Sequence, residues 1–188
     1  MNVQTKKRKR MRRLLLIIVI MTFSAAGLKA QLLALKTDAL WDGAMTPNLS
    51  AELVTGNKTS VNVSVFGNYK PWRVDMKMVG VMPEFRYWFG GRPLFREFIG
   101  VAALGTSYDI TWSNEVYKGD AFGAGLTFGY AFYLSPHWNV ECYGCVGAVY
   151  YDQKHYYTKD SYTENRRTAH GYALLPFKLG VSFVYIIK

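Results

Sequence analysis

Residues 120–134 read DAFGAGLTFGYAFYL, and this stretch decides the fold class of the chain. Every second position is apolar and mostly bulky: Phe122, Ala124, Leu126, Phe128, Tyr130, Phe132 and Leu134. The positions between them are mostly Gly or Ala, with Thr127 and Tyr133 as exceptions. Such alternation is typical of a β-strand, whose successive side chains point to opposite faces. A strand of about 15 residues is longer than the usual five or six and could cross a membrane at a strong tilt.

The same alternation recurs along the chain and predicts eight strands. We expect them at residues 31–41, 48–56, 59–69, 76–89, 97–111, 120–134, 138–151 and 170–187. Gly, Pro, Asn or Asp occurs in the connections, as turns require. The predicted fold class is therefore all-β, an eight-stranded antiparallel up-and-down barrel.

The predicted connections alternate in length along the chain. Short turns are expected at 56–58, 90–96 and 135–137, and outer loops at 42–47, 70–75, 112–119 and 152–169. The longest loop falls on the outer side, which is the asymmetry of outer-membrane barrels.

Charge is distributed unevenly along the sequence. The 188 residues contain 23 Lys and Arg against 13 Asp and Glu, a formal net charge of +10. Residues 1–30 hold eight of the basic residues and no acidic one, so residues 31–188 carry 15 basic and 13 acidic side chains. Because the basicity is local, we expect no nucleic-acid partner.

Residues 1–30 have the three parts of a secretory signal peptide. A basic segment at 6–13 precedes an apolar run at 14–23 and a small-residue stretch that ends in Ala30. The apolar run is too short to span a bilayer comfortably. We therefore expect export and cleavage, with residues 31–188 as the mature barrel. Translation could start at Met1 or Met11, and an uncleaved signal anchor is the alternative.

Charged residues share the strand face opposite to the bulky apolar one. With the bulky face outward, three cations and four anions point inward: Lys36, Asp38, Glu52, Glu84, Arg86, Glu141 and Lys178. The interior of an eight-stranded barrel is only wide enough to be filled by side chains, so charges there must pair. We predict a closed lumen held together by ion pairs. A proton or ion path is the alternative.

Aromatic residues indicate the boundaries of a membrane. The five tryptophans lie near predicted strand ends, where aromatic girdles belong: Trp41, Trp72, Trp88, Trp112 and Trp138. The last strand resembles the C-terminal signal read by the barrel-assembly machinery through Gly180, Phe183 and Tyr185, although three residues follow Tyr185. Alternate residues from Phe177 to Ile187 are expected to face outward. Together these features predict the bacterial outer membrane, with a soluble barrel as the alternative.

Candidate catalytic and metal-binding residues are few. Cys142 and Cys145 form a C-x-x-C motif inside a predicted strand. There they would point to opposite faces about 10 Å apart, too far for a disulfide, so we expect two unpaired, buried thiols of unknown modification. A hydrolase site needs a nucleophile within hydrogen-bond reach of a base, and nothing in the spacing of His137, His155 and His170 shows such a pair. We expect no catalytic site, metal or cofactor.

The connection at 152–169 is polar and rich in Tyr, Lys and Arg. Candidate contact residues are Tyr156, Tyr157, Lys159, Arg166 and Arg167. Arg and Lys bind phosphates, and Tyr is enriched at interfaces. We expect contact with lipopolysaccharide or with an envelope protein; a solvated loop without a partner is the alternative.

Two motifs carry a family resemblance. KTDAL at 36–40 leads to TPNLSAE at 46–52, and PEFRYWF follows at 83–89. Over the whole mature length, the chain resembles a domain-of-unknown-function family of small outer-membrane barrels in Bacteroides-type bacteria, often encoded near fimbrial genes. Asp38 stands where Asn is commoner in the family. The resemblance implies an outer-membrane β-barrel and brings no catalytic residues.

These observations favour a structural or adhesive role, such as support of a fimbrial or other envelope assembly. Two alternatives stay open: an outer-leaflet lipid-modifying enzyme, and a secreted lipocalin-like barrel that binds an apolar ligand. The second would need an apolar interior and a polar exterior, and the alternation of this sequence has the opposite sense.

Overall fold

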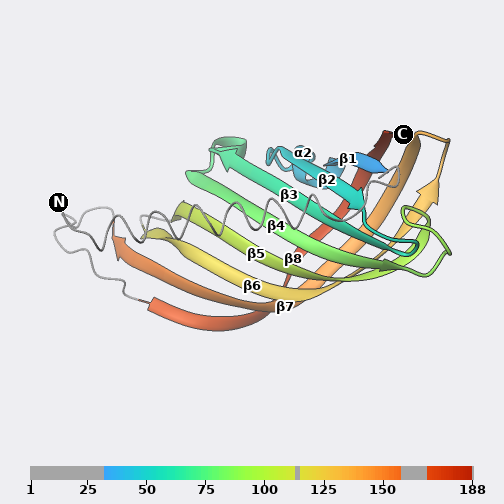
Figure 1. Ribbon diagram of the computed structural model, residues 1–188. Helices are drawn as coiled ribbons and strands as arrows, with labels where there is room; N and C mark the ends of the chain where they lie inside the picture. The colour runs from blue at the N-terminus through green and yellow to red at the C-terminus, as the bar shows by residue number, and fades with distance from the viewer. Residues whose placement is uncertain (1–31, 113–114, 158–168, 188) are drawn as a thin grey trace, which may run out of the picture. The chain divides into compact units, whose positions relative to one another are not determined.

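The eight predicted strands are present and close into an antiparallel up-and-down barrel (Figure 1). The computed structural model describes residues 32–112, 115–157 and 169–187. The strands are β1 (Leu33–Asp38), β2 (Asn48–Val54), β3 (Thr59–Tyr69), β4 (Met76–Trp88), β5 (Arg96–Trp112), β6 (Glu115–Tyr133), β7 (Trp138–Tyr157) and β8 (Ala169–Ile187). A helix α2 (Ala39–Gly43) follows β1, and a 3₁₀ turn η1 (Pro71–Arg73) precedes β4. The predicted fold class is confirmed.

The first strand is shorter than predicted because Asp38 starts a helix. Its Oδ1 accepts hydrogen bonds from the backbone N–H of Leu40 at 2.9 Å and of Trp41 at 3.0 Å. Aspartate is a favoured N-cap residue, since its carboxylate satisfies donors that have no partner within the helix. The strand prediction for residues 39–41 was therefore wrong.

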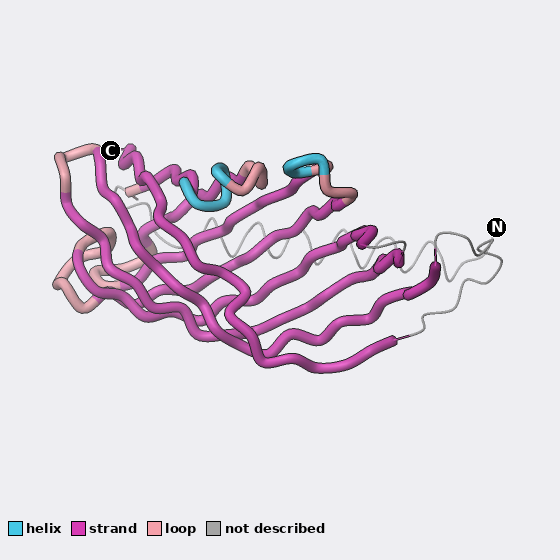
Figure 2. Tube along the Cα trace, turned by 180° about the vertical axis from the view of Figure 1, so that it is seen from behind, coloured by secondary structure: helices cyan, strands magenta, loops and turns pink. Residues whose placement is uncertain are grey.

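Strands β5 to β8 are longer than predicted. They contain 17, 19, 20 and 19 residues, against 6 in β1 and 7 in β2. The predicted outer loop at 112–119 is mostly strand, because β5 and β6 stay paired as far as Trp112 and Glu115. Strand β7 likewise enters the predicted loop 152–169 and reaches Tyr157. In Figure 2 these long strands extend beyond the short ones.

The barrel has two unlike ends. The short-turn end carries the connections 55–58, 89–95 and 134–137, together with Leu33 and Ile187. The opposite end, here called the helix end, carries α2 and η1. Among the described residues, no helix is long and apolar enough to cross a membrane.

Burial alternates along the strands in the predicted sense. On β6, Phe122, Leu126 and Phe128 are exposed on the outer wall, whereas Thr127 is buried inside. Strand β4 alternates in the same way, with Arg86 buried beside the exposed Tyr87. The barrel therefore has an apolar outside and a mixed, closely filled inside.

Phe177 departs from this alternation. The register between β7 and β8 shifts next to Cys145 and Val146, so one residue of β8 is inserted there. Phe177 is partly buried and packs against the inner cluster of Met82, Ala102 and Cys145. The prediction that Phe177 shares the outer face was wrong, because a bulge changes the parity of a strand.

The tryptophan girdle is incomplete. Trp72, Trp112 and Trp138 are exposed, as a girdle requires, whereas Trp88 is fully buried inside the barrel. Trp41 lies in α2 with its ring edge-on to Phe66 at 4.9 Å. The girdle prediction was wrong for Trp88. On this part of β4 the even-numbered residues point inward, and Trp88 is one of them.

Candidate functional site: a buried ionic network in the barrel lumen

Five charged side chains from four strands meet inside the barrel. They are Lys36 on β1, Glu52 on β2, Glu84 and Arg86 on β4, and Glu141 on β7, each at most 3% exposed. All occupy inward positions of their strands, so the pleat alone directs them toward a common centre. The lumen thus holds charges that the apolar outer wall excludes.

Arg86 is the centre of this network. Its Nη1 donates to Oε2 of Glu52 and of Glu141, both at 3.0 Å, and its Nη2 donates to Oε2 of Glu84 at 2.8 Å. The guanidinium also lies 4.4 Å from the ring centre of Phe98. One planar cation with several donors can thereby serve three carboxylates at once.

Lys36 completes the pairing of two of these carboxylates. Its Nζ lies 2.6 and 2.7 Å from the two oxygens of Glu141 and also contacts Glu52. Ser60 donates to the other oxygen of Glu52 at 2.5 Å. Buried charges of opposite sign need such multiple hydrogen bonds to offset their desolvation.

Asp38 lies in a separate part of the lumen. Its Oδ2 accepts from the hydroxyl of Tyr143 at 2.6 Å and of Ser182 at 3.3 Å, while its Oδ1 caps α2. A Cβ atom at Gly180 would collide with this carboxylate. Glycine at 180 therefore makes room for Asp38, in addition to any role in an assembly signal.

Lys178 has a different set of partners. Its Nζ donates to Oγ of Ser64 at 3.0 Å and lies 4.8 Å from the ring centre of Tyr143. It forms no ion pair with a carboxylate of the described residues. Lys178 and Asp38 thus form hydrogen bonds with uncharged groups and no ion pair within the described ranges.

A hydrophobic plug closes the short-turn end below the network. Trp88 donates its indole N–H to Ser60 at 2.8 Å, and Asn139 donates its amide to the carbonyl of Leu94 at 2.6 Å. Leu94 is 3% exposed, so the 89–95 connection folds into the barrel end. The buried residues packed there are Ala34, Trp88, Leu94, Phe98, Ala131, Tyr143, Val184 and Ile186.

The sequence also carried a signal for hydroxyl and amide residues that were not predicted. Ser60, Asn62 and Ser64 alternate on β3 with Val61 and other valines, and all three polar residues are buried. Asn62 donates to Glu84 at 3.3 Å. A period-2 alternation of polar and β-branched residues would have placed them in the lumen.

The other candidate residues are spread over the molecule. Phe183 and Tyr185 point outward on β8, 48% and 41% exposed, and Gly180 is buried. Tyr156 and Tyr157 end β7, but their side chains lie outside the described part of the structure. Lys159, Arg166 and Arg167 also lie outside the described residues.

The cysteines and histidines form no common site in the described part of the chain. Both cysteines are free, and Cys145 is buried inside. The prediction of burial was wrong for Cys142, which is exposed because its position on β7 faces the outer wall. His137 stacks on Tyr185 with ring centres 6.3 Å apart. Within the described ranges, no three His, Cys, Asp or Glu side chains form a group that could hold a metal ion.

Comparison with known proteins identifies a family. A family model described as Protein of unknown function (DUF3575) matches residues 14–187. The chain belongs to this family. The match confirms the resemblance to an uncharacterised domain family, and the bacterial group and the link to fimbrial genes stay predictions.

Two further comparisons complete the picture. No curated protein matches this DUF3575 chain. Among solved structures it is similar to the crystal structure of Neisserial surface protein A, with 13% sequence identity and a TM-score of 0.39. That similarity covers 83% of this chain and 92% of the other.

Proposed function

We propose that this protein is a small structural barrel of the bacterial outer membrane, with a plugged lumen that conducts nothing. The observation that carries the proposal is the outer wall, where an apolar band ends at one row of polar residues. Residues 1–30 would serve as the export signal, as their sequence predicts.

The height of the apolar band supports this location. From Val79 on β4 to Phe89, one residue beyond its end, the outward residues are all apolar or aromatic. Ten residues at about 3.3 Å each measure about 33 Å along a strand. At the usual barrel tilt of about 40°, this corresponds to about 25 Å along the membrane normal, the height of the apolar band in outer-membrane barrels.

Toward the helix end, the apolar band ends at a row of residues that are partners across neighbouring strands. Ser107, Asp120, Asp152 and His170 are successive Cα partners on β5 to β8. One row toward the short-turn end, the partners are Gly105, Phe122, Tyr150 and Tyr172. A step from polar to aromatic residues is the pattern expected at the edge of a bilayer.

The lumen contents favour this role over the two alternatives. A lipocalin-like binder needs an apolar cavity, whereas this interior is filled by Arg86 and its carboxylate partners. An enzyme needs a nucleophile hydrogen-bonded to a base. Among the described residues no serine is hydrogen-bonded to a histidine, and neither alternative gains support from the described contacts.

The proposed partners follow from this location. The barrel-assembly machinery would insert the chain through its last strand, which contains Gly180, Phe183 and Tyr185. The polar loop with Lys159, Arg166 and Arg167 would contact lipopolysaccharide or an envelope protein, such as a fimbrial component. Chemical cross-linking in native membranes, followed by identification of the attached protein, tests the second point.

Gel mobility tests the membrane barrel itself. The unboiled protein in detergent should migrate differently from the boiled protein, because a closed barrel resists unfolding by detergent at room temperature. Carbonate should leave it in the membrane fraction. Unchanged mobility together with complete extraction by carbonate would refute the proposal.

A further inference from the structure

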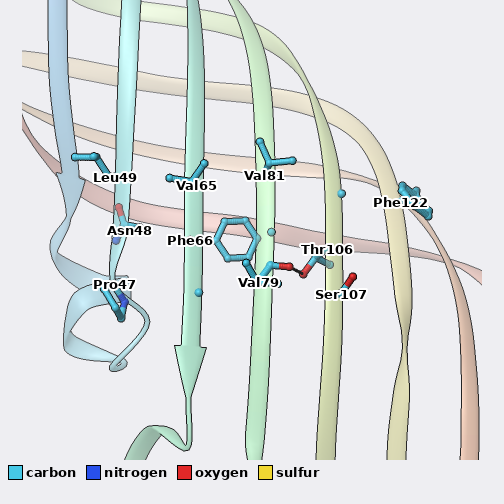
Figure 3. A pocket seen from close by; sticks show the side chains of 13 residues that line it. Pro47, Asn48, Leu49, Val65, Phe66, Val79, Val81, Thr106, Ser107 and Phe122 are labelled. Atoms are coloured by element: carbon cyan, nitrogen blue, oxygen red, sulfur yellow. Dashed lines mark hydrogen bonds between the residues drawn. The ribbon is translucent and has the colours of Figure 1, made fainter. Parts of the chain in front are cut away.

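A groove crosses the outer wall between β2 and β6 (Figure 3). Its volume is about 880 Å³, within the range of about 300–1,000 Å³ typical of ligand pockets. Leu49, Val65, Val81, Gly105 and Phe122 are successive Cα partners across these strands and form one row of its lining. The groove is therefore apolar and faces the proposed bilayer.

The groove passes over Gly105, which has no side chain to fill it. Gly105 occupies an outward position of β5, between Val81 and Phe122. A Cβ atom there would meet Phe122 only at 3.9 Å and Val81 at 4.0 Å, so space for a side chain is present and unused. The ring of Phe122, 62% exposed, rises at one border. The depression therefore has the form of a slot between apolar ridges.

A basic pocket of about 430 Å³ continues the groove toward the helix end. Val79 and Ser107 line both cavities, so the two are contiguous. The charged residues that line it are Lys77, Lys118, Lys154, Asp109 and Asp120. Lys118 lies 3.2 Å from Asp109, and Ser107 donates to Asp120 at 2.6 Å. The lining carries three cations against two anions.

The strand register aligns these lysines. Lys77, Asp109, Lys118 and Lys154 are successive Cα partners in one row across β4 to β7. Lys77 is four residues from Val81 on the same strand, a separation of about 13 Å. The lysine row thus lies one row beyond the boundary row of Ser107, Asp120 and Asp152, on the helix-end side of the apolar band.

We propose that this wall binds a phosphorylated lipid of the outer leaflet. An acyl chain lies in the groove over Gly105, and the phosphate contacts Lys77, Lys118 and Lys154. Ammonium groups bind phosphate oxygens strongly, and Asp109 and Asp120 accept hydrogen bonds from headgroup hydroxyl or amine groups. This inference rests on the proposed membrane location.

A lipid fits this surface better than a peptide does. A peptide in the apolar groove would bring backbone N–H and C=O groups to a depth without water, where unsatisfied polar groups are costly. An acyl chain brings none. The lysines in turn select a phosphate over an uncharged headgroup, because each basic residue near a membrane surface favours anionic lipid.

Native mass spectrometry of the purified full barrel in detergent tests the phosphate contact. The probes are bisphosphorylated lipid A and the same lipid after removal of its phosphates. The variant K77Q/K118Q/K154Q should bind the phosphorylated probe at least about tenfold more weakly, because each lysine near a membrane surface strengthens binding of an anionic lipid about fivefold. The control K58Q, in a turn at the other end, should bind like the wild type.

A second pair of variants tests the groove. Gly105→Leu should weaken binding of both probes severalfold by filling the slot, and the control Ala148→Leu, on the outer wall of β7, should not. Equal binding by all variants, or displacement of the lipid by inorganic phosphate, would overturn the inference. Each variant is also tested by gel mobility. A variant that still migrates differently before and after boiling has kept the barrel, so a loss of lipid binding is then not a loss of the fold.

Discussion

At the scale of the residue, Arg86 matters most. It is fully buried and contacts Glu52, Glu84 and Glu141. Its removal would leave Glu84 without its cation, and would leave Glu52 and Glu141 to share Lys36 alone. In an interior of low dielectric constant, an uncompensated charge costs far more than the ion pair contributes. The arginine is therefore needed to compensate the negative charge of the buried carboxylates.

Replacement of Arg86 by Ala should lower the free energy of unfolding by about 3–5 kcal/mol. The control is Arg92→Ala, since Arg92 lies 4.9 Å from the ring centre of Phe95 in an exposed connection. The control should change stability by no more than about 1 kcal/mol. Urea titration of the barrel in lipid vesicles, followed by tryptophan fluorescence, measures both. Similar midpoints for the two variants would show that the network adds little.

Parity along the strands is enough to assign the seven charged inner residues, but it fails at the β8 bulge and does not name the partners. The alternation of β4 places Glu84 and Arg86 inside, as the structure does. Lys178 was expected in an ion pair, yet its ammonium donates to Ser64, on β3. Such contacts depend on how strands far apart in the sequence are aligned in the barrel. A single sequence does not determine that alignment.

At the scale of the element, strand ends were the least predictable feature. A connection at 112–119 is predicted from its turn residues, Asn114 and Gly119. In the structure, Lys118 and Asp109 are Cα partners and form an ion pair outside the apolar band. Backbone pairing continues where the outward residues become polar, so hydropathy marks the edge of the band and not the edge of the strand.

Two lysine substitutions on β5 should differ in cost. Val101→Lys, near the middle of the outer band, should destabilise the inserted barrel by about 2–4 kcal/mol, whereas Ser107→Lys, at its boundary, should cost at most about 1 kcal/mol. Val101 is 55% exposed, so an effect on core packing is small. Unfolding from vesicles gives both values. Equal costs would contradict the assigned depth of the band.

At the scale of the whole molecule, the barrel is blocked twice. The network around Arg86 fills the middle, and Trp88 and Leu94 close the short-turn end. Strand number, closure and the sense of the faces followed from the sequence alone. The inward fold of the 89–95 connection did not, because it depends on the amide of Asn139 holding the carbonyl of Leu94.

The reconstituted barrel should therefore show no steady ion conductance in a planar bilayer at moderate voltage. Replacing Trp88 and Leu94 by Ala should leave the lumen closed, because the ionic network around Arg86 still fills the middle of the barrel. Discrete conductance steps from the wild type would contradict the plugged lumen. An established porin measured in the same bilayer provides the positive control.

The seam where the barrel closes has a consequence for its assembly. Strand β1 pairs with β8 over only six residues, and Lys36 crosses that seam to Glu141, 105 positions later in the chain. A slip of β1 by one residue would turn Lys36 and Asp38 outward into lipid. A barrel closed in that shifted register would therefore be less stable, because two charges would face the lipid.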